Sequence, residues 1–535
     1  MERFYLRTLL LVFVLIANSA SAQPISLDGS FGNSGTVFQT YEGYLCAVVS
    51  MRTTSDGKLL IYAARDESEF FQSAGFILQR RSTDGSLDTS FGNNGVVLIE
   101  GIEHDGSSNK CLLLLSDGKI MVTGRGQNAN FGNFVTYRFN ADGSLDSSFG
   151  TNGVVVTDVG GVVDEAKAVL LQTAGNKIVV VGEFQDEVNP VRKPCVVRYL
   201  ENGTLDSTFG VGGKAFFTTL PENSDNQITD VHVEANGKIV MVINHKTSNG
   251  DSDFCLARLA ANGIVDTGFG NNGAQITDFG GDDRVNCIRK YDNTYYLFGS
   301  SATSDESSQI AISRYNSAGI LIQAFGVNGK KLMNRAADSN YDVIYHVDII
   351  NEKIIAVGAG GTGTGDSFNL HGLIIQLNID GSIDTFFNQT GYKLFNAPNT
   401  SYGSYYSITR GTSGSIFAAG TAYLQNDYST GGILINRFLT STLSVDVNSD
   451  SRFSISPNPF NDKIQIKSLT DSELPEMFEL YDITGRLINA SNIRTATNSE
   501  QSMIEVSGLD TLSSGIYVLI AKSNSGIQKF KILKK

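Results

Sequence analysis

The chain has 535 residues, a formal net charge of −14 at pH 7, and 56 glycines against only 8 prolines. This length exceeds what one hydrophobic core usually supports, so several domains or a repeat array are expected. Abundant Gly, Tyr and Phe favour an all-β protein with many tight turns over a helical or disordered chain. The acidic balance argues against a nucleic-acid partner.

Residues 1–22 have the organisation of a secretory signal peptide. Arg3 and Arg7 precede an apolar stretch over 8–17, and small residues at 20–22 form a cleavage site. The apolar run has about half of the roughly 20 residues that cross a bilayer, which argues against a membrane anchor, and no later stretch is longer. We therefore expect export through the inner membrane and no transmembrane span after cleavage.

The cysteines are an odd and sparse set for an exported protein, and they can form at most two disulfides. Each lies in a predicted strand with apolar neighbours, so we expect buried free thiols. They are Cys46, Cys111, Cys195, Cys255 and Cys287.

A nine-residue phrase recurs seven times at intervals of 56 to 62 residues, with LDTSFGNNG and LDSSFGTNG among its copies. The copies begin at Leu27, Leu87, Leu145, Leu205, Val265, Leu321 and Ile383. Each is followed by four predicted strands, for example over 154–157, 166–171, 177–181 and 196–200. The tight turns between them are Asp-Gly or Asn-Gly, which accept the positive φ of a hairpin turn. Each unit is thus predicted to be an antiparallel meander.

Neighbouring meanders must stack, because one four-stranded sheet cannot bury both faces. Radial stacking of about four to eight such sheets gives a β-propeller. Residues 35–40 supply a lone first strand, whereas the last set, over 405–439, lacks a final one. We therefore predict a seven-bladed β-propeller over 27–440, closed by the N-terminal strand. The alternative is an open solenoid, which usually needs capping repeats that this sequence does not show.

Two positions of the phrase carry the same residue in most copies. The Phe is predicted to fill the gap between neighbouring sheets, and occurs at Phe31, Phe91, Phe149, Phe209, Phe269, Phe325 and Phe387. The Asp has two interpretations, one cation per blade or an Asx turn, and occurs at Asp28, Asp88, Asp146, Asp206, Asp266 and Asp384. Ile322 replaces it in the sixth copy while the phrase persists. The turn is therefore preferred, and neither a metal nor a cofactor is expected.

The seven copies resemble the delta-60 repeat family, bacterial repeat proteins that carry LDxSFGxxG at about this period. The resemblance covers roughly residues 27–440. It implies a propeller-like body and no particular reaction, so no catalytic residue is assigned.

The loops opposite the Asp-Gly turns differ from copy to copy, and binding residues concentrate on such loops. Candidate binding residues in or beside them are Asp164, Glu165, Asp282, Asp283, Tyr402, Tyr405, Tyr423 and Tyr428. Two carboxylates about 5 to 9.5 Å apart would suit a glycosidase, and tyrosine rings could stack on a sugar or a partner protein. The alternatives are solvated loop acids and ordinary packing.

A polar linker over 441–452 separates the repeats from 453–535, whose short alternating strands predict a small Ig-like β-sandwich. This segment contains FSISPNPF, LYDITGRL and LSSGIYVL and ends in KFKILKK. The motif residues are Pro457, Asn458, Pro459, Gly485, Gly515 and Tyr517.

The C-terminal segment resembles the type A sorting domain of the type IX (Por) secretion system. The resemblance implies that the type IX machinery recognises 453–535, passes the chain across the outer membrane and removes the module. The body is then released or attached to the outer cell surface. An ordinary Ig-like binding domain is the alternative.

The function predicted for the body is that of a surface or secreted scaffold that binds a glycan or a protein through its variable-loop face. One alternative is a secreted polysaccharide hydrolase or lyase, and another is a purely structural surface protein. The scattered histidines include no HExxH motif, which argues against zinc chemistry and a Ser-His-Asp triad.

Overall fold

The structure, a computed structural model, describes residues 25–439 and 453–534. It omits 68–71, 104–107, 109, 127–131, 173–174, 248–249, 305–306, 338, 363–368, 386, 412–413, 426, 469–473, 475–476, 483–487, 489–493, 499–502 and 524–525. The chain divides into two compact units, Met1–Thr440 and Ser441–Lys535. The predicted signal peptide, the linker and Gly485 lie outside the described residues. Among those described, every helix-or-strand element is a β-strand, and no helix is long and apolar enough to cross a membrane.

The described strands of the first unit form five four-stranded and two five-stranded antiparallel sheets. The first three sheets in chain order are β3 (Tyr44–Thr53), β4 (Leu59–Glu67), β5 (Gln72–Arg81) and β6 (Val96–Ile99); β7 (Ile102–Glu103), β8 (Leu112–Leu114), β9 (Ile120–Gly126), β10 (Phe134–Phe139) and β11 (Val154–Thr157); and β12 (Val163–Gln172), β13 (Lys177–Gln185), β14 (Lys193–Tyr199) and β15 (Lys214–Phe216). The next three are β16 (Asp225–Val233), β17 (Ile239–Lys246), β18 (Ser252–Leu259) and β19 (Ala274–Thr277); β20 (Asp282–Tyr291), β21 (Thr294–Ser304), β22 (Ser307–Tyr315) and β23 (Lys330–Met333); and β24 (Asp342–Ile350), β25 (Lys353–Thr362), β26 (Asn369–Asn378) and β27 (Tyr392–Phe395). The last sheet combines β28 (Thr400–Arg410), β29 (Ile416–Leu424) and β30 (Asp427–Leu439) with the N-terminal strands β1 (Ser26–Leu27) and β2 (Thr36–Gln39).

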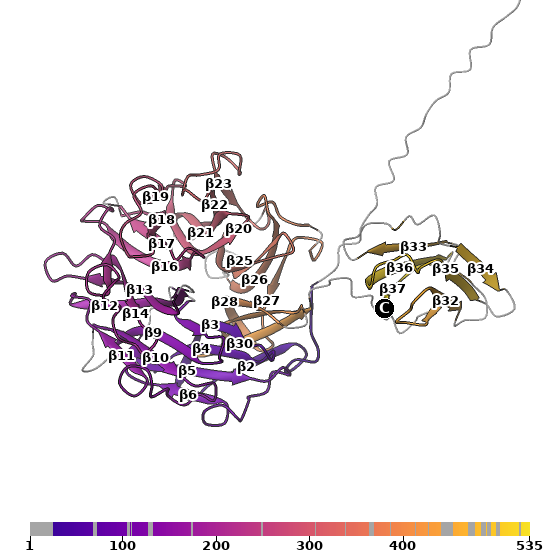
Figure 1. Cartoon of the computed structure of the whole chain (residues 1–535), viewed down its shortest axis with the longest axis horizontal. Coiled ribbons are helices and arrows are strands. Elements are labelled where there is room, and N and C mark those ends of the chain that lie inside the picture. Colours follow the sequence, from indigo (N-terminus) through magenta and orange to yellow (C-terminus); the bar gives the residue numbers. More distant parts are fainter. Residues whose placement is uncertain are drawn as a thin grey trace, which may run out of the picture. The chain divides into compact units, whose positions relative to one another are not determined.

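The sheets follow one another around a central axis in chain order (Figure 1). Their first strands contact in succession from β12 through β16, β20 and β24 to β28, and β28 contacts β3. Near the two ends of the described part of the first unit, β2 pairs antiparallel with β30, and Asn436 Nδ2 donates to Thr36 Oγ1 at 2.9 Å. The predicted all-β propeller-like body is therefore confirmed.

In every sheet except that of the short strands β7 and β8, the first of the long strands along the chain carries a β-bulge. The bulge lies at the equivalent position in each of these sheets, where the register against the second strand shifts. The extra residues are Val49, Lys167, Thr229, Asn286, Tyr345 and Tyr406. In three sheets, the side chain directly after the bulge residue accepts a backbone N–H from the first strand of the neighbouring sheet. These hydrogen bonds join Asp230 to Ile288 at 2.9 Å, His346 to Ile408 at 3.0 Å and Ser407 to Met51 at 3.1 Å. The bulges thus orient the side chains that follow them toward the neighbouring sheet, where they form hydrogen bonds.

The repeated phrase forms a turn and a contact between sheets. Asp28 Oδ1 accepts hydrogen bonds from the Ser30 backbone N–H at 3.0 Å and from its hydroxyl at 2.7 Å, which confirms the Asx turn. Equivalent bonds form at Asp88, Asp146 and Asp206. The phrase phenylalanines from Phe31 to Phe269 are buried between sheets, as predicted.

An arginine clasp, absent from our sequence predictions, secures each of these turns. In four copies an Arg eight residues before the Asp forms an ion pair with its carboxylate, in the pairs Arg80–Asp88, Arg138–Asp146, Arg198–Asp206 and Arg258–Asp266. The same guanidinium lies over the Phe of the phrase, at 4.1 to 4.7 Å from the ring centroid. It also donates to a backbone carbonyl of the next sheet, for example Arg258 to Ser317 at 2.8 Å. The clasp therefore joins neighbouring sheets by charge and by packing.

The five cysteines are buried and free, which confirms that prediction. Burial raises the pKa of Cys46, Cys255 and Cys287 to about 12. These thiols are structural, since the reactive thiolate form is suppressed.

The second unit contains two sheets around one core. The sheets are β31 (Phe453–Ser456), β32 (Lys463–Ser468), β35 (Met503–Ser507) and β34 (Arg494–Asn498), and β33 (Met477–Asp482), β36 (Gly515–Ser523) and β37 (Gly526–Lys534). Ile464 and Val506 of the first sheet share a buried cluster with Leu519 and Ile532 of the second. The segment is thus a small two-sheet domain.

The sorting-motif residues lie at the edges and the core of this domain. Pro457 and Pro459 flank Asn458 between β31 and β32, and Asn458 Oδ1 accepts the backbone N–H of Leu533 at 2.8 Å. Gly515 begins β36 opposite Lys534. Tyr517 is buried, and its hydroxyl donates to the Ser513 carbonyl at 2.8 Å. The motif therefore holds the C-terminal strand.

Candidate functional site

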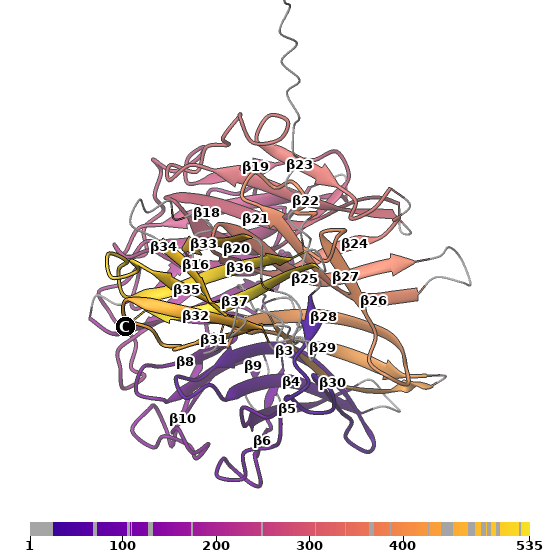
Figure 2. The same ribbon diagram turned by 90° about the vertical axis from the view of Figure 1, so that its right-hand side faces the viewer.

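Two pockets of the first unit lie at the side where the first strand of a sheet begins and its second strand ends. The variable loops were predicted on this side. Figure 2 shows the ribbon turned by 90° from Figure 1, with β24 to β27 labelled to the right of centre. The predicted candidates lie near this side, but in strands rather than loops. Asp164 and Glu165 belong to β12, and Asp282 and Asp283 belong to β20.

The first pocket, the amide pocket, has a volume of about 730 Å³. Its polar lining includes Gln227, Asn244, Asn286, Ser300, Ser308 and Tyr341. The bulge residues Thr229, Asn286 and Tyr345, from three neighbouring first strands, all line it. Amide and hydroxyl groups therefore converge at the inner ends of three sheets.

Several contacts fix the side chains of the amide pocket. Asn286 Nδ2 donates to the Ile344 carbonyl at 2.7 Å, and Asn244 Oδ1 accepts the Val285 N–H at 2.7 Å. The Tyr345 ring lies 4.9 Å from that of Tyr406. Burial raises the pKa of both phenols, so their hydroxyls remain protonated donors.

The predicted candidate Asp282 also lines the amide pocket, where its charge is neutralised. Arg284 Nε donates to Asp282 Oδ2 at 3.0 Å, and the Ser252 N–H donates to Oδ1 at 3.0 Å. Burial alone would raise the pKa of Asp282, but these donors outweigh it and the pKa is lowered. The pocket thus presents mainly uncharged polar groups.

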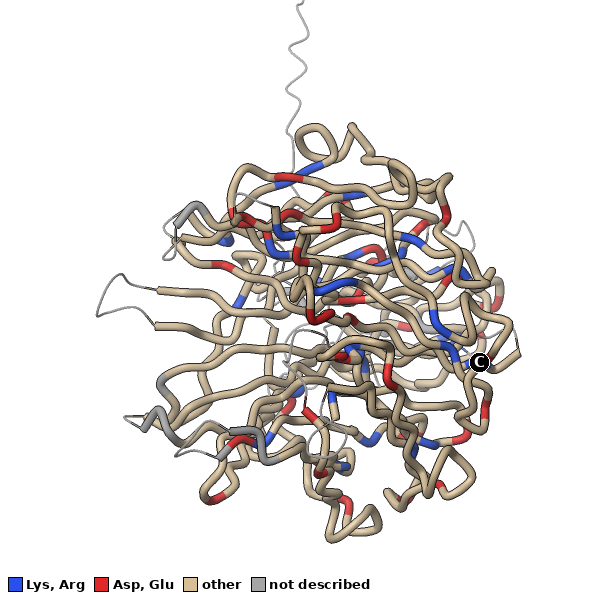
Figure 3. Tube along the Cα trace, turned by 90° about the vertical axis from the view of Figure 1, so that its left-hand side faces the viewer, with Lys and Arg blue, Asp and Glu red and all other residues tan. Residues whose placement is uncertain are grey.

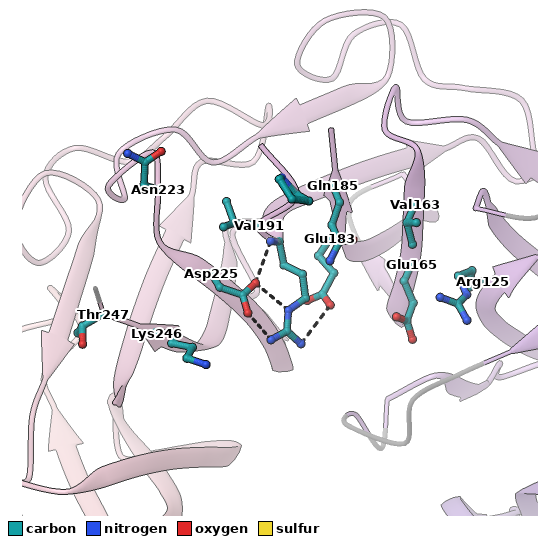
Figure 4. A pocket seen from close by; sticks show the side chains of 12 residues that line it. Arg125, Val163, Glu165, Glu183, Gln185, Val191, Asn223, Asp225, Lys246 and Thr247 are labelled. Carbon is teal, nitrogen blue, oxygen red and sulfur yellow. Dashed lines mark hydrogen bonds and ion pairs between the residues drawn. The ribbon is translucent and has the colours of Figure 1, made fainter. Parts of the chain in front are cut away.

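The second pocket, the ionic pocket, has a volume of about 610 Å³ and is lined by both signs of charge (Figure 4). Arg192 donates from Nε and Nη2 to Asp225 at 2.8 and 2.6 Å. Lys167, a fully buried bulge residue, lies 2.9 Å from Glu165 and 3.5 Å from Glu183. The acids of this pocket are therefore held by cations.

The remaining predicted candidates do not share one site. Asp164 is buried and accepts the N–H groups of Val159 at 2.6 Å and Gly161 at 3.1 Å. The Tyr402 and Tyr423 rings form an edge-to-face pair at 6.0 Å. Tyr428 lies in β30, and its side chain is outside the described residues.

The structure places Tyr405, which was predicted as a binding residue, in the core of the first unit. Its side chain is fully buried, and its hydroxyl donates to Asn436 Oδ1 at 2.7 Å. Period-two alternation along β28 turns this ring into the core, where Phe438 packs against it.

The bulge residues were missed by sequence reasoning, because a bulge breaks the alternation that assigns side chains to faces. The signal was nevertheless present. Aligned copies place Lys167, Thr229, Asn286 and Tyr345 in one column, whose chemistry changes while its neighbours remain largely apolar.

A charged cluster joins the first strands of neighbouring sheets, β16, β20 and β24. Asp230 Oδ1 is 2.9 Å from Lys110 Nζ, and Asp230 Oδ2 is 3.7 Å from Arg289 Nη1. Arg289 contacts His346, whose pKa burial and the nearby cations hold well below its usual value. Elsewhere acidic and basic residues are interspersed along the unit (Figure 3).

Two family models match parts of the chain. The model of a secretion system C-terminal sorting domain matches residues 454–535. The model of a β-propeller domain of unknown function, DUF5122, matches residues 115–149, 176–209 and 234–269. No curated protein sequence matches the chain significantly.

Solved structures to which the chain is similar include three proteins. The β-propeller domain of the Trilobed protease from Pyrococcus furiosus is 10% identical, with a TM-score of 0.37 over 72% of this chain and 92% of that one. A putative exo-β-1,3-galactanase from Bifidobacterium bifidum is 16% identical, with a TM-score of 0.29 over 59% and 95%. An α-L-arabinofuranosidase of Fusarium graminearum is 10% identical, with a TM-score of 0.33 over 75% and 96%. None of these values is high enough to bear on activity.

Proposed function

We infer that this chain, a β-propeller protein with a C-terminal sorting domain of the type IX secretion system, is exported and binds an uncharged polar ligand of the glycan class in its amide pocket. The sorting domain at 454–535 supports secretion or attachment at the outer surface. The signal-peptide pattern of residues 1–22 is consistent with the first export step.

We propose that the body is a seven-bladed propeller closed by β2, and that the sorting domain has an Ig-like topology. The pairing of β2 with β30 and the contact of β28 with β3 support closure. Closure matters for binding, because it fixes the first strands that carry the pocket residues.

The observation that carries the binding proposal is the convergence of Thr229, Asn286 and Tyr345, bulge residues of three sheets, on the amide pocket. Amides and hydroxyls both donate and accept hydrogen bonds, as sugar hydroxyls do. Tyr341, at the same pocket, offers an aromatic surface for a sugar ring. Of the charged residues that line the pocket, Asp282 is paired with Arg284, and Asp251 is a further carboxylate, so the lining favours a polar ligand that is not an anion.

The experiment is a binding screen of the chain from residue 23 to residue 535 on arrays of glycans and extracellular proteins. Asn286→Ala and Tyr341→Ala should weaken the Kd of the ligand by about tenfold or more each, as removal of a hydrogen bond or a stacking contact does. Thr247→Ala, in the ionic pocket, should leave the Kd unchanged. Unchanged binding in the amide-pocket variants, or no binding to either array, would contradict the proposal.

A secreted hydrolase is the second candidate, because Glu165 and Glu183 lie opposite each other in register and line one pocket. Both carboxylates contact Lys167, and Glu183 Oε2 also accepts the Ile228 N–H at 2.9 Å. These contacts favour a structural role. Polysaccharide cleavage that Glu165→Gln abolishes would reverse this order of preference.

A further inference from the structure

We propose that Asp253, Asp278 and Asp283 form a binding site for a hard divalent cation, calcium in the first instance. Each offers one carboxylate oxygen, and these three oxygens lie within 4.8 Å of one another. Asp253 belongs to β18 and Asp283 to β20, while Asp278 directly follows β19. Three carboxylates from two neighbouring sheets therefore meet at one junction.

The environment of Asp283 points to a missing ligand. The residue is fully buried, and its Oδ2 accepts the Phe279 N–H at 2.5 Å. Its Oδ1 is buried and accepts no hydrogen bond of normal geometry from any described residue, and the one side-chain donor beside the carboxylate is the Ser301 hydroxyl. An unsatisfied buried carboxylate oxygen is costly, and more so beside two further carboxylates.

The other sheets provide internal comparisons. Asp164 and Asp342 occupy the same position as Asp283, three residues before the bulge. Both oxygens of Asp164 accept backbone N–H groups. Both oxygens of Asp342 are bonded to Arg335, whose backbone N–H donates to Oδ2 at 2.9 Å. Asp283 has neither arrangement.

The sequence explains the difference. The segment from Asp158 to Asp164 is one residue longer than that from Asp278 to Asp283, and Gly161 supplies the donor to Oδ1 of Asp164. The residue opposite Asp158 is Asn133, because Phe134 pairs with Thr157. In the junction before β20 the corresponding residue opposite Asp278 is Asp253, because Phe254 pairs with Thr277. This junction has lost a backbone donor and gained a negative charge.

No Lys or Arg forms an ion pair with these three carboxylates within the described part of the chain. Lys330 Nζ donates instead to the backbone carbonyl of Asp278 at 2.6 Å, and Arg284 is paired with Asp282. An all-oxygen set with three negative charges suits Ca²⁺, Mg²⁺ or Mn²⁺. Calcium tolerates irregular oxygen geometry best, so it is the first ion to test.

Gly280 and Gly281 lie between Asp278 and Asp283 and line the amide pocket. A bound cation would therefore hold one wall of that pocket. The site does not rest on the proposed function, because cation binding is measured without any other ligand.

The test uses the chain from residue 23 to residue 535 after treatment with EDTA. Calorimetric titration with CaCl₂ should give one saturable site, and calcium should raise the Tm by several degrees, reversibly with EDTA. Asp253→Asn and Asp278→Asn should abolish both effects. Asp283→Asn should abolish them and also raise the Tm of the ion-free protein, because it removes the buried charge.

Asp164→Asn, at the equivalent buried position, is the matched control and should keep the full calcium-dependent rise in Tm. Because Asp278 is exposed, Asp278→Asn should leave the fold intact, and its loss of calcium binding then reports on the site itself. Absence of heat and of a Tm shift with Ca²⁺, Mg²⁺ and Mn²⁺ at millimolar concentration would overturn the proposal. A calcium effect that persists in all three cluster variants would overturn it as well.

Discussion

Arg437 Nε donates to Asp28 Oδ2 at 2.7 Å, which joins residues 409 positions apart in the sequence. The same guanidinium donates to the Thr83 carbonyl at 2.6 Å and lies 5.6 Å from the Phe31 ring centroid. Arg437 thus forms the same kind of clasp as Arg80 and its equivalents. It differs in that it joins residues near the two ends of the first unit. Removal of one charged member of such a pair leaves the other partly buried without its partner.

Asp28→Asn should therefore lower the free energy of unfolding by about 1 to 3 kcal/mol, the usual cost of an unsatisfied, partly buried charged hydrogen bond. Urea unfolding followed by tyrosine fluorescence measures it, since the chain has no Trp. Asp84→Asn is the control, because that exposed carboxylate caps a turn within one sheet and forms no ion pair with any residue that the structure describes. Equal effects of the two variants would show that the contact between the chain ends contributes nothing.

The clasp aspartates predict a loss of stability in acid. At Asp206, burial alone would raise the pKa, but hydrogen bonds from Thr208 and the charges of Arg198 and Lys177 outweigh it and lower the pKa from 3.8 to about 2. The pKa is lowered also at Asp28, Asp88, Asp146 and Asp266. A lowered folded-state pKa gives stability that is present above the unfolded-state value and is lost as the pH falls through the folded-state value.

The free energy of unfolding should therefore decline between about pH 4 and pH 2, and Asp206 should account for about 2 kcal/mol of the decline. Urea titrations at a series of pH values measure it. Asp206→Asn should start lower at pH 7 and decline less. A variant that runs parallel to the wild-type protein down to pH 2 would contradict the ion-pair explanation.

The repeated phrase predicted much of the fold, because its chemistry is local. An Asx turn, a Gly at positive φ and a buried Phe depend on near neighbours, so each copy indicates the same turn wherever it stands. The amide pocket depends instead on non-local register. A bulge at Asn286 or Tyr345 reverses the face that alternation assigns. The three-carboxylate junction was also missed, because Asp253 and Asp283 meet only through pairing between sheets.

Asp230 balances several cations near the axis, and Asp230→Asn should cost about 3 to 5 kcal/mol of unfolding free energy. The amide oxygen still accepts the Ile288 N–H, but Lys110 and Arg289 lose their counter-charge. Lys110→Met added to Asp230→Asn should recover part of the loss, since one uncompensated cation is then removed. Additive effects of the two substitutions, measured by urea unfolding, would disprove the charge coupling.

The sixth copy of the phrase allows the clasp to be built rather than removed. Ile322 stands where the other copies have Asp, yet the Phe325 N–H still donates to the Ile322 carbonyl at 2.9 Å, so the turn is formed. Arg314, eight residues earlier, lies over the Tyr296 ring at 4.7 Å. Ile322→Asp combined with Ala324→Ser supplies both the carboxylate and the hydroxyl of the intact copies.

This double variant should raise the free energy of unfolding by about 0.5 to 2 kcal/mol, as restoration of a consensus contact commonly does. Ala324→Ser alone should change it little, because the hydroxyl then has no carboxylate to bond. The gain should also shrink as the pH falls from about 4 to about 2, because a growing fraction of the new carboxylate is protonated and no longer pairs with Arg314. A double variant no more stable than wild type at pH 7 would show that the turn and the buried Phe325, rather than the ion pair, hold neighbouring sheets together.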